Sequence, residues 1–134
     1  FKGRYSTTPT NLDGIVDSAA GATVFACGVQ THNSFLCLDG YGNPKGSILA
    51  AAKRQGKGTG IVVTKSVTDA TPAAFSAHSL YRSWHEMISK QQTMRQINGE
   101  PMLDILFGGG RRYFERWGFF RNETMWDEYG WNKV

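Results

Sequence analysis

The 134-residue sequence contains no uninterrupted apolar run long enough to cross a membrane. It begins Phe-Lys-Gly-Arg, with neither an initiator methionine nor the profile of a signal peptide, which favours a segment of a longer protein. Its 15 Lys and Arg residues are scattered rather than arranged in a stripe, although the net charge is +4. We therefore do not expect a dedicated nucleic-acid module. Internal repeats and low-complexity segments are also missing.

Cysteine is scarce, with only Cys27 and Cys37 in the chain. The two could pair, but Cys27 also lies where an apolar helix face would bury it, and two cysteines do not identify a redox compartment. Asn122 begins the sequon Asn-Glu-Thr, which matters only if the chain is exported. The sequence leaves open both the pairing of the cysteines and the glycosylation of Asn122.

The apolar residues that are present, 40% of the chain, suit one globular core of ordinary domain size. Their spacing, with glycine, proline and asparagine between the segments, predicts helices and short strands in alternation. The predicted helices cover residues 18–30, 47–55, 73–79 and 81–95, and the predicted buried strands cover 61–64 and 102–107. This order indicates an α/β fold in which layers of helices surround a largely parallel sheet.

Asp17 and Ser18 open a run of very small residues that ends near Cys27. A helix that begins here places the Ser18 hydroxyl beside the positive end of the helix dipole, where an anion is favoured. The small residues allow the first turn to approach another backbone closely. This stretch alone favours the other interpretation, a plain serine N-cap on a buried, alanine-rich helix.

A second polar group follows the predicted strand at 61–64. Asp69 and Thr71 stand at its carboxyl end, where ligand sites gather in open α/β sheets. Pro72 suits the first position of a new helix and biases Thr71 towards extended angles. Arg82 follows on the next helical segment.

A serine, nearby carboxylates and an arginine are the parts of a phosphoryl-transfer site. Serine can act as the nucleophile, and a guanidinium can bind two phosphate oxygens at once, which lysine cannot do. On residue type alone, each of these residues also has an ordinary explanation. Asp69 and Thr71 could only start a helix, and Arg82 could only be solvated.

Three segments in the same order resemble motifs of the alkaline phosphatases. Residues 16–23 (Val-Asp-Ser-Ala-Ala-Gly-Ala-Thr) resemble the nucleophile motif of that family. Residues 60–82, which include Thr-Asp-Ala-Thr-Pro-Ala-Ala and Arg82, resemble its next block, and residues 104–111 resemble a third. The sequence as a whole is most similar to the vacuolar-type fungal enzymes. The resemblance implies that residues 1–134 are a partial alkaline phosphatase catalytic domain.

The resemblance also implies a role for each matched residue. Ser18 would form a phosphoserine intermediate, with its oxygen held by one of two zinc ions. Asp17 would orient Arg82, and Arg82 would bind the phosphate. Asp69 and Thr71 would act at a magnesium ion. The substrate would be a phosphate monoester.

The sequence departs from the family pattern in its metal ligands. The family begins its metal site with an upstream Asp and completes it with downstream Asp, Glu and His residues, and this chain matches neither group. His32, His78 and His85 stand in none of those motifs, and we expect His78 to have a packing or hydrogen-bonding role. The chain alone is therefore expected to be an incomplete, inactive fragment.

Further expectations come from the family alone. They are a homodimer, a vacuolar, periplasmic or extracellular location, and a membrane anchor, if there is one, outside this chain. Two alternatives remain open from the residues. The chain could be a non-catalytic piece that binds phosphate or other anions without zinc, or a purely structural domain.

Overall fold

A computed structural model describes residues 15–115. The Ser, Thr, Gly and Asn residues of 1–14 predict a loop, and aromatic residues are dense from Tyr113 to the end of the sequence. Residues 1–14 and 116–134 lie outside the described residues. None of the described helices is both long and apolar enough to span a membrane.

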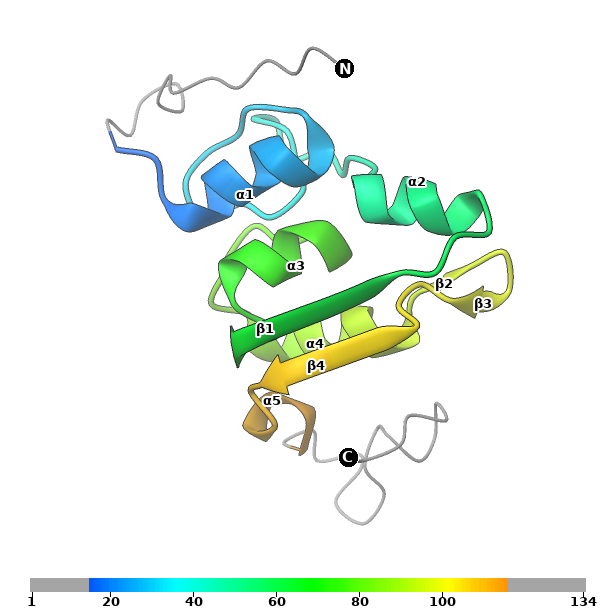
Figure 1. Cartoon of the computed structure of the whole chain (residues 1–134). Coiled ribbons are helices and arrows are strands. Elements are labelled where there is room, and N and C mark those ends of the chain that lie inside the picture. The colour runs from blue at the N-terminus through cyan, green and yellow to red at the C-terminus, as the bar shows by residue number, and fades with distance from the viewer. Residues whose placement is uncertain (1–14, 116–134) are drawn as a thin grey trace.

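The described chain has an α/β architecture, as predicted (Figure 1). The parallel strands β1 and β4 form one pair, and β2 and β3 form a separate antiparallel hairpin. The elements in order are α1 (Ser18–Cys27), α2 (Ile48–Arg54), β1 (Gly60–Ser66), α3 (Ala70–Ser76), α4 (His85–Met94), β2 (Gln96–Ile97), β3 (Glu100–Pro101), β4 (Ile105–Gly109) and α5 (Arg112–Glu115).

Helices α1 and α3 pack against each other through methyl groups. Their shared core also takes in Leu36 and Ile88, and its alanines are Ala19, Ala22, Ala26, Ala70, Ala73, Ala74 and Ala77. The apolar residues of this helix predict burial over much of its surface, but the Phe25 side chain is 72% exposed. Helix α1 also ends earlier than predicted, because Gly28 adopts φ +70° and its N–H bonds the Val24 carbonyl. The small residues therefore bring two helices close together, as the sequence suggests.

Helix α3 begins three residues earlier than predicted. Asp69 caps it with its side chain, Ala70 is its first residue, and Thr71 is helical rather than extended. Pro72 lies within the first turn, where the missing N–H would have had no partner in the helix. The proline is therefore compatible with a helix that starts before it.

Helix α4 is shorter than predicted and buries a polar face. Its buried residues are Ile88, Ser89, Gln92 and Thr93. The amphipathic pattern of the sequence predicts an inner face made of Trp84, Met87, Ile88 and Met94. Of these only Ile88 is fully buried, and the prediction is wrong for Trp84 and Met94, which are 47% and 37% exposed. Gln92 can be buried because its Nε2 donates to the Val67 carbonyl and to Ser76 Oγ.

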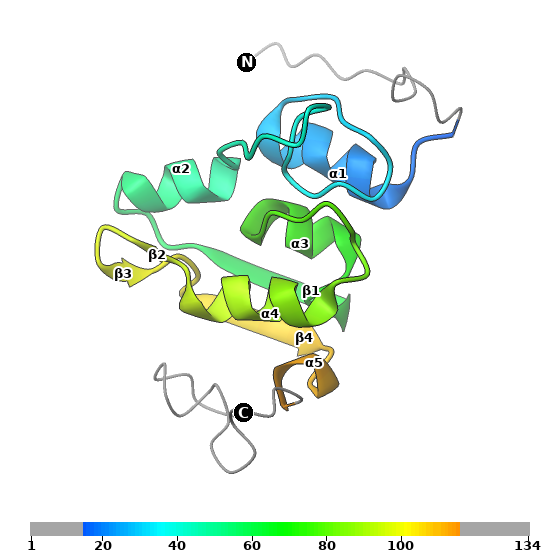
Figure 2. The same ribbon diagram turned by 180° about the vertical axis from the view of Figure 1, so that it is seen from behind.

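The parallel pair of strands is buried on one face, not on both as predicted. Ile61 and Leu106 belong to a buried core that also contains Val67, Leu103 and Phe114. Val62 and Phe107, on the opposite face, are 72% and 54% exposed. Helix α4 covers one face of the strands (Figure 2), and no described helix lies over the other (Figure 1). The prediction fails because burial depends on what covers the sheet.

The two cysteines pair. Cys27, at the end of α1, forms a disulfide with Cys37, with a Cα–Cα distance of 5.9 Å. The bond closes the loop of residues 28–36 against the helix. The question that the sequence leaves open is thus answered in favour of pairing.

A buried lysine joins α2 to the start of β4. The Lys53 side chain is 7% exposed, and its Nζ lies 2.6 Å from Asp104 Oδ1 and 3.3 Å from Glu100 Oε2. Asp104 Oδ2 also accepts the Thr59 N–H at 2.7 Å. The hydrogen bond from Lys53 is the main cause that lowers the pKa of Asp104 below its ordinary value. The carboxylate is therefore charged at neutral pH.

We expect Asp104→Asn to lower the free energy of unfolding by about 2 kcal/mol, because Lys53 loses its closest anionic partner. Glu100→Gln is the matched control. Glu100 is 73% exposed, so its loss should cost less than about 0.5 kcal/mol. Denaturant unfolding of the full-length variants at neutral pH measures both, and equal effects would contradict a special role for Asp104.

The same pair predicts a pH dependence. A depressed folded-state pKa means that Asp104 contributes stability above its ordinary pKa of 3.8, and that this contribution is lost as the pH falls through the folded value. The difference in unfolding free energy between wild type and Asp104→Asn should therefore shrink in acid. If the difference in unfolding free energy stayed constant from neutral pH to about pH 3, the ion pair would not be the source of that difference.

Candidate active site

The start of α1 presents two polar side chains with different roles. Asp17 is the N-cap, and its Oδ1 accepts the Ala20 N–H at 2.8 Å. Ser18 is the first helical residue and is exposed. The interpretation of Ser18 as a plain N-cap is therefore wrong. Because Asp17 satisfies the helix end, the Ser18 hydroxyl is left for other contacts.

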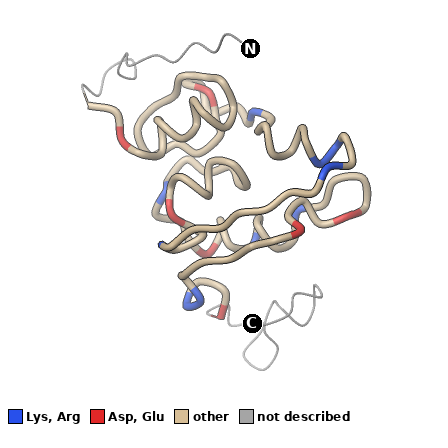
Figure 3. The backbone as a smooth tube through the Cα atoms, in the orientation of Figure 1, with Lys and Arg blue, Asp and Glu red and all other residues tan. Residues whose placement is uncertain are grey.

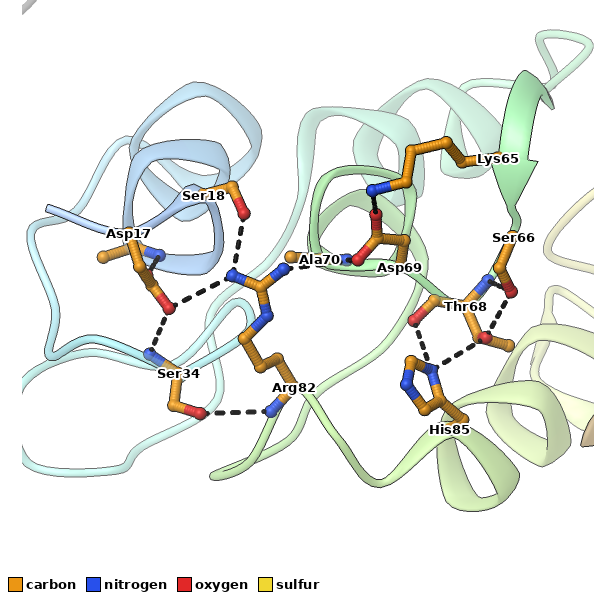
Figure 4. Close-up of polar contacts among 11 residues, drawn as sticks. Asp17, Ser18, Ser34, Lys65, Ser66, Thr68, Asp69, Ala70, Arg82 and His85 are labelled. Atoms are coloured by element: carbon orange, nitrogen blue, oxygen red, sulfur yellow. Dashed lines mark hydrogen bonds and ion pairs between the residues drawn. The ribbon is translucent and has the colours of Figure 1, made fainter. Parts of the chain in front are cut away.

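Arg82 lies between α3 and α4 and reaches three side chains of the predicted site (Figure 4). Its Nη1 donates to Ser18 Oγ at 2.8 Å and to Asp17 Oδ2 at 3.3 Å. Its Nη2 donates to Asp69 Oδ1 at 3.3 Å. The side chain is 33% exposed, so an anion from solvent can reach the guanidinium. One cation thus joins the start of α1 to the end of the β1–α3 connection.

Asp69 is held by cations on both of its oxygens. Oδ1 accepts the Ala70 N–H at 2.9 Å as well as the contact from Arg82, and Oδ2 lies 2.6 Å from Lys65 Nζ. The Lys65 hydrogen bond is the largest cause that lowers the pKa of Asp69, with smaller contributions from Ala70 and Arg82, while burial opposes them. Asp69 is therefore a carboxylate at neutral pH.

Thr71 is the one predicted site residue that stands apart. It lies on the first turn of α3, two residues after Asp69, and is exposed. Among residues 15–115, no hydrogen bond joins its side chain to Asp69 or Arg82. The structure thus brings together Asp17, Ser18, Asp69 and Arg82, and it leaves Thr71 beside them.

The described residues alone do not fit a zinc centre. Within residues 15–115 there is no group of three or more His, Cys, Asp or Glu side chains placed to hold a metal ion. Asp69 and Thr71 offer oxygen donors of the kind that magnesium prefers. The Asp69 carboxylate, however, is already paired with Lys65 and Arg82. We therefore derive no chemical step through a metal.

His78 and His85 both make hydrogen bonds, but of the two only His85 does so near the site. His78 Nε2 lies 2.7 Å from the Lys45 carbonyl oxygen, and burial is the main cause that lowers its pKa. The expected hydrogen-bonding role of His78 is thus found. His85 Nδ1 lies 3.0 Å from Thr68 Oγ1, which is 2.7 Å from Ser66 Oγ (Figure 4). This chain of contacts starts at the end of β1, close to Asp69.

Asn33 and Ser34 contact the site but are not identifiable from the sequence. The Asp17 N–H donates to Asn33 Oδ1 at 2.9 Å, and the Ser34 N–H donates to Asp17 Oδ2 at 3.0 Å. In the sequence they belong to a cluster of turn-forming residues that ends the first helix. The Ser34 contact is made by its backbone N–H, and an asparagine in a turn gives no sign that its side chain reaches Asp17.

The charges of the described chain are spread over its length. Figure 3 shows Lys and Arg at several separate places along the backbone, with acidic residues between them. The cations at the site are Arg82 and Lys65, and each is matched by a carboxylate. The site is therefore a local balance of charges rather than part of a basic surface.

Comparison with known proteins places this geometry in a family. The alkaline phosphatase sequence profile matches residues 1–131. Alkaline phosphatase 4 of Bacillus subtilis is 41% identical over 115 residues, which cover 85% of this chain and 25% of that protein. The repressible alkaline phosphatase of Saccharomyces cerevisiae is 45% identical over 100 residues, which cover 75% of this chain and 18% of that protein.

Solved structures agree with the sequence comparison. The alkaline phosphatase of the Antarctic bacterium TAB5 superposes with a TM-score of 0.74 at 36% identity, over 84% of this chain and 31% of that one. Over this part of the chain, the fold is that of the alkaline phosphatases. The chain belongs to the alkaline phosphatase family. It spans between about a fifth and a third of the length of these relatives.

The double role of Asp17 predicts that two substitutions differ. Asp17→Ala removes the cap and should lower the free energy of unfolding by about 1 kcal/mol. Asp17→Asn retains an oxygen that can accept the Ala20 N–H, so it should cost less than about 0.5 kcal/mol. Denaturant unfolding of both full-length variants measures the difference. Equal losses would show that the cap does not contribute.

Proposed function

We propose that the full-length protein hydrolyses phosphate monoesters through a phosphoserine intermediate on Ser18. The observation that carries the proposal is the position of Arg82, whose Nη1 bonds both the Ser18 hydroxyl and the Asp17 carboxylate. A guanidinium in contact with an exposed serine can bind phosphate oxygens beside that hydroxyl. The family membership supports the same reaction.

The proposed reaction has two transfers. Ser18 Oγ attacks phosphorus, the bond to the ester oxygen breaks, and the serine proton passes in net terms to the leaving alcohol. Water then attacks the phosphoserine, which releases inorganic phosphate and restores the hydroxyl. Arg82 binds two phosphate oxygens through both transfers, and Asp17 holds its guanidinium in place.

The metal content is also a proposal from the family. We infer two zinc ions and one magnesium ion per site in the full-length enzyme, which as Lewis acids would stabilise charge on oxygen. Ser18 would face the zinc site, and Asp69 and Thr71 would face magnesium. Other ligands would come from outside residues 15–115. A TAB5 alkaline phosphatase variant, similar to this chain with a TM-score of 0.74, was solved with magnesium bound.

A non-cytosolic location, whether vacuolar, periplasmic or extracellular, is part of the proposal. It is supported by the Cys27–Cys37 disulfide, because such bonds persist in oxidising compartments. A homodimer is proposed from the family resemblance alone.

The decisive experiment follows the phosphoserine. Full-length enzyme loaded with zinc and magnesium is mixed with a labelled phosphate monoester and quenched in acid. Wild type should retain label, and Ser18→Ala should retain none. Ser83→Ala, at an exposed serine next to Arg82, is the matched control and should label like wild type.

Each other result has a definite meaning. Label on Ser18→Ala would disprove the nucleophile assignment. Binding of inorganic phosphate by wild type with neither label nor turnover would support instead an anion-binding protein without catalysis.

Replacement of Arg82 tests the phosphate-binding role. Arg82→Lys keeps the positive charge but loses the paired N–H donors with which a guanidinium binds two phosphate oxygens. The inhibition constant of inorganic phosphate should therefore rise by roughly tenfold or more. Arg112→Lys, at an exposed arginine on α5, is the control and should leave that constant unchanged. Inhibition of monoester hydrolysis by phosphate gives both values. An unchanged constant in Arg82→Lys would contradict a bidentate contact.

A further inference from the structure

Residues 33–34 contact both members of the Asp17–Arg82 pair. The Asn33 side chain accepts the Asp17 N–H at 2.9 Å and donates to the Ile15 carbonyl at 2.8 Å. The Ser34 N–H donates to Asp17 Oδ2 at 3.0 Å, the same oxygen that accepts from Arg82. The Arg82 N–H in turn lies 3.4 Å from Ser34 Oγ. The dipeptide thus bridges two site residues that are 65 positions apart.

The carboxylate of Asp17 is fully engaged as a result. Oδ1 accepts the Ala20 N–H of the helix start, and Oδ2 accepts from Ser34 and from Arg82. Because both oxygens are bonded, the orientation of the Asp17 carboxylate is fixed. The orientation of the Arg82 guanidinium beside Ser18 depends on that carboxylate.

The segment that carries residues 33–34 is anchored at both sides. Towards α1, the disulfide ties Cys37 to Cys27, and Thr23 Oγ1 donates to the Phe35 carbonyl while it accepts the Cys37 N–H. Towards Arg82, the backbones of Leu36 and Ser79 exchange hydrogen bonds of 2.8 and 3.2 Å. A shift of the segment would therefore move both Asp17 and the approach to Arg82.

Ser34 holds a backbone conformation that serine rarely adopts. Its φ is +75°, and that of Cys37 is +47°. Left-handed angles at residues other than glycine persist only where surrounding contacts impose them, and they concentrate at functional sites. Here the left-handed angle is the conformation in which the Ser34 N–H meets Asp17.

We propose that Ser34 is a positioning residue for phosphoryl transfer, which holds the Asp17 carboxylate against Arg82, and that the Cys27–Cys37 disulfide keeps it there. The proposal rests on the proposed function. In the described contacts Ser34 touches neither Ser18 nor the Arg82 guanidinium, and its Oγ meets only the backbone N–H of Arg82, at 3.4 Å. It acts through Asp17.

The test compares two substitutions at one position in the full-length, metal-loaded enzyme. Ser34→Gly keeps the N–H and accepts the left-handed angle, so kcat/KM should stay within about threefold of wild type. Ser34→Val strongly disfavours that angle, so kcat/KM should fall by roughly tenfold to a hundredfold as the carboxylate moves. The inhibition constant of inorganic phosphate should rise only in Ser34→Val.

A background without the carboxylate separates positioning from general structural damage. In Asp17→Ala the contact between Ser34 and the carboxylate is already lost. Adding Ser34→Val to that variant should therefore lower kcat/KM by less than about a further twofold. An equal loss in both backgrounds, or no loss in either, would overturn the proposal.

A second variant makes the test independent of whether Ser34→Val folds. Cys27→Ser with Cys37→Ser retains Asn33 and Ser34 but opens the loop, and it should show a smaller loss of kcat/KM that also disappears in Asp17→Ala. A loss that persists there would count against the proposal. Ser18→Ala is measured alongside. If it retains activity, the proposed nucleophile is wrong; if it is inactive while both segment variants match wild type, the positioning proposal alone fails.

Discussion

The contacts of one guanidinium organise this structure. Arg82 bonds Ser18 and Asp17 at the start of α1 and Asp69 at the start of α3, so it joins the two helices at the ends where their backbone N–H groups lack helical partners. Each of the two carboxylates also caps its own helix. The charges that stabilise the helix ends are thus the same charges that hold the arginine. Stability and the geometry of the site cannot be separated here.

The sequence predicts the parts of the site better than their contacts. Asp17, Ser18, Asp69 and Arg82 are recognisable because helix caps, strand ends and the family motifs all leave signals in residue type. Thr71 is recognisable in the same way, but the extended angles expected for it were wrong, since Pro72 is tolerated in a first turn. Ser34 is different, because it meets Asp17 through its backbone N–H at a left-handed angle that residue type does not encode. Asn33 uses its side chain, but its place in a cluster of turn-forming residues gives no sign of that contact.

The fold shows the same division between local and distant causes. The α/β order and the approximate helices follow from the spacing of apolar residues and from the glycine, proline and asparagine between the segments. Burial does not, because it depends on which elements come together. Trp84 and Phe107 are apolar yet exposed, while Gln92 and Lys53 are polar yet buried with their partners. Pairing of Cys27 with Cys37 likewise depends on the path of the loop between them.

The alanine contact between α1 and α3 has a consequence for the kinds of motion open to the site. Methyl groups have no rotamers, so the interface cannot adjust by side-chain rearrangement as one made of leucine or methionine can. The separation of the two helices is therefore set by backbone contact distances. Ser18 and Asp69, one at the start of each helix, are held as two points on a single stiff body. Any change in the shape of the site must come from the surrounding loops.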